Sequence, residues 1–167
     1  MNASLWWLRA SGWAPAIVLA LSLAVTPCAG LVRRVRGAAP RGAASVRRAL
    51  GITAAALALG HAVVALKVYV PRPWFAVIRG VPWLLSGALA LAVLVALLVT
   101  SFPAPTRALR VRAWKPLHRL AYVAAALVAH HLAVGPLAPR AWVIAWTVVL
   151  AVVLALRAVS CEARATE

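Results

Sequence analysis

Five long apolar segments alternate with short basic segments along the chain. Each apolar segment is close to the roughly twenty residues that an α-helix needs to cross a bilayer. A helix with only one buried face would show a regular polar stripe, and these segments show little of one. The pattern therefore predicts an all-α integral membrane protein, a five-helix transmembrane bundle with helices at about 13–31, 48–69, 82–101, 116–134 and 140–159.

The segments between the predicted helices are too short to form a soluble domain, so we expect residues 1–167 to form a single membrane domain. Pro71 and Pro73 interrupt the chain after the second predicted helix, because proline cannot continue a regular hydrogen-bonded helix. Pro116 suits the first turn of the fourth helix, where its missing N–H is no loss. The first apolar segment lacks the strongly basic start of a secretory leader, so we expect it to remain as a span.

The formal net charge is +16, which in a soluble protein would indicate nucleic-acid binding. Here the basic residues lie between apolar segments, so the lipid bilayer is the expected partner and nucleic acid is not. Cytoplasmic loops of membrane proteins are enriched in Lys and Arg. We therefore predict an outside N-terminus and a cytoplasmic C-terminus, because the following basic residues fall in the first and third loops: Arg33, Arg34, Arg36, Arg41, Arg47, Arg48, Arg107, Arg110, Arg112, Lys115 and Arg119.

Acidic residues are nearly absent, with no Asp and with Glu162 and Glu167 confined to the tail. Acid–base catalysis by carboxylates within the membrane is therefore excluded, and no nucleotide-binding fingerprint is present. Cys28 and Cys161 both fall at predicted cytoplasmic helix ends, where a structural disulfide is not expected.

Histidine remains as the candidate functional residue type, since an ionisable side chain inside a membrane helix is a functional hypothesis by default. Without carboxylates to pair with, neutral imidazoles point to metal binding, and helical bundles hold haem iron in this way. His61 lies thirteen residues beyond Arg48, and His131 lies thirteen residues beyond His118. At about 1.5 Å per residue both lie about 20 Å from the inner end of parallel helices. We therefore expect His61 and His131 to be the two axial ligands of one haem.

His118 lies at the inner end of the fourth predicted helix, where it could hold a second haem or a flavin such as FMN. No histidine on another helix matches its depth. His118 and His131 are about 140° apart around an ideal helix. They would therefore bind cofactors on different sides of the helix, unless the helix contains a local bulge. His130 is expected to face another helix without binding a cofactor. Two alternatives stay open: a non-redox membrane scaffold or assembly subunit with structural histidines, and a protein that binds one haem only.

Several motifs resemble those of the ferric reductase-like transmembrane domain family. One is the basic pair followed by Leu-Gly in "VRRALGITAAALALGHAV", a helix that carries His61. Another is Thr-Ser at a helix end, followed by "WKPLHRLAY" and a further histidine thirteen residues beyond His118. More narrowly, the chain resembles the MsrQ subfamily, the haem-binding membrane subunits of a bacterial periplasmic methionine sulfoxide reductase system.

The resemblance implies one or two b-type haems held by His61, His118 and His131, and it gives His130 no role. It also implies a multi-pass protein of the bacterial inner membrane that passes electrons outward. The donor would be a flavin reductase or a quinol, and the acceptor a periplasmic oxidoreductase. On this reading the chain is a redox subunit rather than a complete enzyme. The subfamily pattern has six helices, one more than we predict here.

Overall fold

The computed structural model describes residues 3–38, 40–102, 111–136 and 138–165, and within them it is all-helical. Five of the described helices are long and apolar enough to cross a membrane. The predicted fold class is therefore confirmed. The long helices are α1 (Ala3–Arg36), α2 (Ala43–Val68), α4 (Pro82–Val99), α6 (Val111–Val134) and α7 (Arg140–Ala165).

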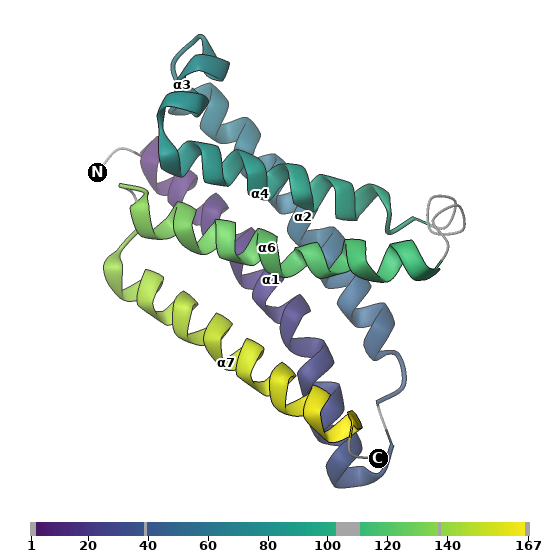
Figure 1. Ribbon diagram of the computed structural model, residues 1–167. Helices are drawn as coiled ribbons and strands as arrows, with labels where there is room; N and C mark the ends of the chain where they lie inside the picture. Colours follow the sequence, from purple (N-terminus) through teal and green to yellow (C-terminus); the bar gives the residue numbers. More distant parts are fainter. Residues whose placement is uncertain (1–2, 39, 103–110, 137, 166–167) are drawn as a thin grey trace.

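The helices pack as two close pairs with a fifth helix alongside. Helix α1 packs mainly against α2, α4 packs mainly against α6, and α7 contacts both α1 and α6 (Figure 1). The start of α1 and the end of α7 lie at opposite ends of the bundle, as an odd number of crossings requires (Figure 1). Which end faces the cytoplasm stays a prediction from the loop charges.

Three helices begin before the boundaries that hydrophobicity predicted, and α2 is one of them, since it begins at Ala43 rather than near residue 48. Helix α1 begins at Ala3 rather than near residue 13, because the Ala, Leu and Arg residues at its start favour helix although the segment is less apolar. Helix α6 begins at Val111, so Pro116 lies inside the helix and not in its first turn. The Trp114 indole N–H donates to the carbonyl of Thr100 at 3.2 Å, which ties this extension to the end of α4.

Some of the segments that connect the long helices were predicted from the sequence, and others were not. A short helix that was not predicted, α3 (Trp74–Gly80), follows the expected proline break, and the Arg72 guanidinium lies over the Trp74 ring. Helix α4 ends at Val99, two residues early, where the Thr100 hydroxyl donates to the carbonyl of Ala96. The third-loop residues 103–110, with Arg107 and Arg110, lie outside the described residues.

The core joins the helices through small residues and interlocking leucines. Ala54 and Ala55 of α2 and the pair Ala124 and Ala125 of α6 are at most 1% exposed. Small side chains allow helix backbones to approach closely, and in lipid this packing replaces the hydrophobic effect as the main source of association. Leu23 of α1, 1% exposed, fills the space beside them.

Replacing Leu23 by alanine is expected to lower the free energy of unfolding by about 2–3 kcal/mol, because it leaves a cavity in a packed interior. Leu21 on the same helix is 52% exposed and serves as the matched control. Leu21→Ala should have little effect, since lipid or detergent fills the space. Denaturant titration of both variants in detergent micelles checks this, and equal losses would contradict the packing described here.

Candidate functional site

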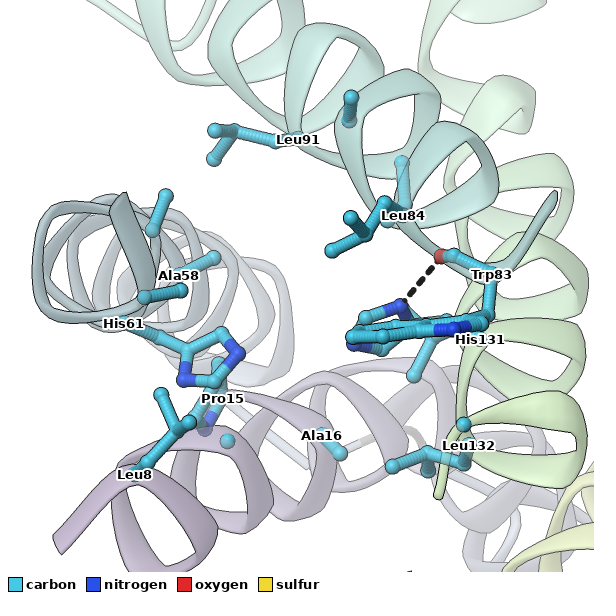
Figure 2. A pocket seen from close by; sticks show the side chains of 18 of the residues that line it. Leu8, Pro15, Ala16, Ala58, His61, Trp83, Leu84, Leu91, His131 and Leu132 are labelled. Atoms are coloured by element: carbon cyan, nitrogen blue, oxygen red, sulfur yellow. Dashed lines mark hydrogen bonds between the residues drawn. The ribbon is translucent and has the colours of Figure 1, made fainter. Parts of the chain in front are cut away.

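Two of the predicted site histidines come together between helices. The ring centres of His61 on α2 and His131 on α6 lie 6.4 Å apart, with their planes at 77°. Figure 2 shows the two imidazoles pointing toward each other across a cavity. Helices α2 and α6 are not a packed pair, so the histidines meet across the space that α1 and α4 enclose with them.

The cavity between the histidines measures about 230 Å³ and has an almost entirely apolar lining. Arg9 is the one charged side chain among the described residues that line it. Much of the remaining wall consists of residues with little or no side chain: Gly12, Ala16, Ala58, Ala62, Gly87 and Ala88.

The imidazole of His131 is fixed by a backbone carbonyl of the neighbouring helix. Its Nδ1 lies 2.7 Å from the carbonyl oxygen of Trp83, in the first turn of α4 (Figure 2). A carbonyl can only accept, so Nδ1 carries the proton and donates. The second ring nitrogen, Nε2, therefore keeps its lone pair, which is the arrangement of a metal-binding histidine.

His61 is fixed in the same way by a hydroxyl. Its Nδ1 lies 3.1 Å from the Ser11 hydroxyl oxygen, and that hydroxyl donates its own proton to the carbonyl of Leu8 at 3.0 Å. The hydroxyl oxygen is therefore free to accept from the His61 Nδ1–H. Both histidines thus adopt the tautomer with an unprotonated Nε2.

Each imidazole also rests against a glycine of a neighbouring helix. A Cβ atom added to Gly87 would lie 2.7 Å from His131 Nδ1, and one added to Gly12 would lie 3.0 Å from His61 Cε1. At Gly87 the group that needs the space is therefore an imidazole ring from the neighbouring helix. These glycines determine how closely the rings can approach α4 and α1.

His118 lies in a different cavity, toward the opposite end of α6. Its ring stacks on Trp114 with centres 4.1 Å apart, and its Nε2 lies 3.4 Å from the Thr100 hydroxyl. Among the described residues, no other histidine lines that cavity. The structure therefore places His118 apart from the His61–His131 pair. Cys28 is exposed and does not line either cavity, and the side chain of Cys161 lies outside the described residues.

His130 is exposed and lines neither of the two cavities. Its Nδ1 lies 3.0 Å from the Ser86 hydroxyl oxygen, and that hydroxyl donates to the carbonyl of Trp83. The same carbonyl thus accepts from Ser86 and from His131. His130 fastens α6 to the turn of α4 that orients its neighbour.

Some residues of the site were not predicted from the sequence. Ser11 and Gly12 lay outside the predicted first span, so only the longer helix α1 brings them to His61. The Trp83 carbonyl belongs to the backbone and has no sequence signal. A small polar residue beside a glycine, two residues before the predicted span boundary, was the available clue for Ser11.

Gly87→Ala is expected to lower the free energy of unfolding by about 1–3 kcal/mol, because the added methyl group displaces the His131 ring or the α4 backbone. Gly60→Ala is the matched control, since a Cβ there meets no atom within 4 Å. It should be neutral or stabilise α2 by up to about 1 kcal/mol through higher helix propensity. Unfolding of the detergent-purified variants without added cofactor measures both. A tolerated Gly87→Ala would show that the ring does not press on α4.

Comparison with known proteins identifies the family of this chain. Residues 11–129 match the family described as ferric reductase like transmembrane component, a range that includes His61 and His118 and ends just before His130. The chain is also 39% identical over 118 residues to the protein-methionine-sulfoxide reductase heme-binding subunit MsrQ of Deinococcus radiodurans. That alignment covers 69% of this chain and 55% of the relative, so the chain spans about half the relative's length. No solved structure matches. The chain therefore belongs to the ferric reductase-like transmembrane family.

Proposed function

We propose that the protein is a haem-binding membrane subunit that passes electrons across the bacterial inner membrane. The observation that carries the proposal is the pair of facing imidazoles, His61 and His131, each with Nδ1 hydrogen-bonded and Nε2 available. The similarity to a named heme-binding subunit supports the same reading.

The closeness of the two rings supports the proposal. A metal–imidazole bond is about 2.0 Å long, so two imidazoles that share one metal ion must lie within a few ångströms of each other. The observed separation is 6.4 Å. No group of three or more His, Cys, Asp or Glu side chains gathers among the described residues, so a pair of axial ligands suits this site better than zinc.

The haem would be b-type, held without covalent attachment. The chain has two cysteines and no C-x-x-C-H motif through which a porphyrin could be attached. When bound, the haem iron would supply one-electron oxidation and reduction. His61 and His131 would hold the haem iron, while Ser11 and the Trp83 carbonyl hold those rings in position and would make their Nε2 atoms more basic.

We propose one haem per chain rather than two. His118 has no second histidine in its cavity among the described residues, whereas the rings of His61 and His131 lie 6.4 Å apart in the other cavity. His118 is therefore not assigned as a ligand of this haem. A second haem, if present, would need a ligand from another chain or from a part of this chain that is not described.

The direction of transfer follows from the proposed orientation. Tyr69, Val70 and Ile78 line the histidine cavity, so it lies at the end of the bundle where α2 joins α4 through α3. The loops at that end carry little positive charge, which supports an orientation with the cavity toward the periplasm. We propose a periplasmic oxidoreductase as acceptor, a methionine sulfoxide reductase being the class that the relative's name suggests. A flavin reductase or a quinol would act as donor at the other end.

His61→Ala and His131→Ala are each expected to abolish the b-type signal, because each removes one axial ligand. His130→Ala and His118→Ala should retain it at one haem per chain. Reduced-minus-oxidised spectra and haem-to-protein ratios of the purified proteins, expressed with ample haem, measure the effect. Wild-type protein without haem, or equally mild effects of all four substitutions, would instead favour the scaffold alternative.

Alkaline phosphatase fused after Gly80 is expected to be active, because the positive-inside rule places that end of the bundle outside. A fusion after Gly42, at the basic end, should be inactive, and a green fluorescent protein at the C-terminus should fluoresce. The reverse pattern would show that the histidine cavity faces the cytoplasm, and it would refute the proposed outward transfer of electrons.

A further inference from the structure

A second and larger cavity, about 800 Å³, lies at the basic end of the bundle. Helices α1, α2, α4, α6 and α7 all contribute to its lining. Five arginines from separate parts of the sequence converge on it: Arg33, Arg47, Arg48, Arg119 and Arg157. No acidic residue is among the described residues that line it.

The chain cannot neutralise this cluster itself. It has eighteen Lys and Arg residues but only two acidic residues, Glu162 and Glu167, both in the C-terminal tail. Like charges gathered in a cavity repel one another unless an anion lies among them. We therefore expect most of the negative charge that neutralises Arg47, Arg48, Arg119 and Arg157 to come from outside the chain.

Two of the arginines are held in position by neighbouring side chains. The Arg47 guanidinium donates to the Thr26 hydroxyl at 2.8 Å, which bridges α2 and α1. The Arg157 guanidinium lies over the Tyr122 ring, 4.5 Å from its centre, and donates to the Tyr122 hydroxyl. Both are half-buried. The cluster is thus partly preorganised, whereas Arg48 and Arg119 are exposed at its edge.

The rest of the lining combines anion-binding groups with an apolar wall. Residues 43–45, the first turn of α2, line the cavity, and this helix has no side-chain cap or acidic residue at its start. The free backbone N–H groups of a helix start attract anions, phosphates in particular. Deeper in the bundle the wall is formed by the side chains of Leu19, Leu23, Leu94 and Leu97.

We propose that this cavity binds the phosphate headgroup of an anionic phospholipid, with the arginines on the phosphate and the leucines against the glycerol and upper acyl chains. A membrane supplies such an amphiphile directly at the helix ends, and basic pockets between helices recognise anionic headgroups. Free phosphate would leave the apolar wall unused. The site does not depend on haem, so this inference and the proposed function can fail separately.

Lipid binding to the delipidated full-length protein in detergent tests the proposal, measured by native mass spectrometry. The probes are phosphatidylglycerol, cardiolipin and phosphatidylcholine, with inorganic phosphate and FMN titrated separately. Arg48→Gln/Arg119→Gln removes two cavity charges from exposed positions. Arg36→Gln/Arg41→Gln removes the same charge from exposed positions outside the cavity and is the matched control. Thermal unfolding verifies that both variants are folded.

We expect the wild type to bind phosphatidylglycerol or cardiolipin in preference to phosphatidylcholine. The cavity variant should lose roughly tenfold to thirtyfold in affinity for the anionic lipid, and the control should stay close to the wild type. Equal losses in both variants would show diffuse charge attraction and overturn the proposal. Cavity-dependent binding of FMN or inorganic phosphate without selectivity for anionic lipid would also overturn it, in favour of a soluble phosphate ligand.

Discussion

The hydrogen bonds on the Nδ1 atoms of His61 and His131 are the interactions on which the site depends. A polar ring nitrogen in a lipid-facing bundle needs a partner, because no water is available to replace it. By occupying Nδ1, the Ser11 hydroxyl and the Trp83 carbonyl fix both the tautomer and the direction of each ring. The two Nε2 atoms can then face the same space between α2 and α6.

The surrounding fold supports this pair in two further ways. Gly12 and Gly87 give each ring a flat surface of helix backbone to lie against. His130 and Ser86 fasten α6 to the first turn of α4, where the Trp83 carbonyl accepts its bonds. The positions of the imidazoles therefore depend on contacts between helices, and the neighbouring helices α1 and α4 supply them.

The sequence predicted the number and approximate place of the long helices, because hydrophobicity and length determine which segments can cross a membrane. It also predicted that His61 and His131 lie at one depth, from the helix rise alone. It did not predict the early start of α1 at Ala3 or the position of Pro116 inside α6, since helix propensity extends past the apolar boundary. Which neighbours hold the rings depends on how each helix is rotated about its own axis. The spacing of residues within one helix does not determine how that helix is rotated relative to another.

Leu19 and Leu94 line both cavities, so the basic end and the histidine end share an apolar partition. Electrostatic interactions weaken far less across hydrocarbon side chains than across water. The guanidinium groups on one side of this partition can therefore influence the potential on the other. Their positive field would favour an added electron between the imidazoles, and an anion bound among the arginines would reduce that influence. If haem and lipid bind as proposed, occupancy at the basic end would thereby adjust the midpoint potential of the iron at the histidine end, without any movement of the helices.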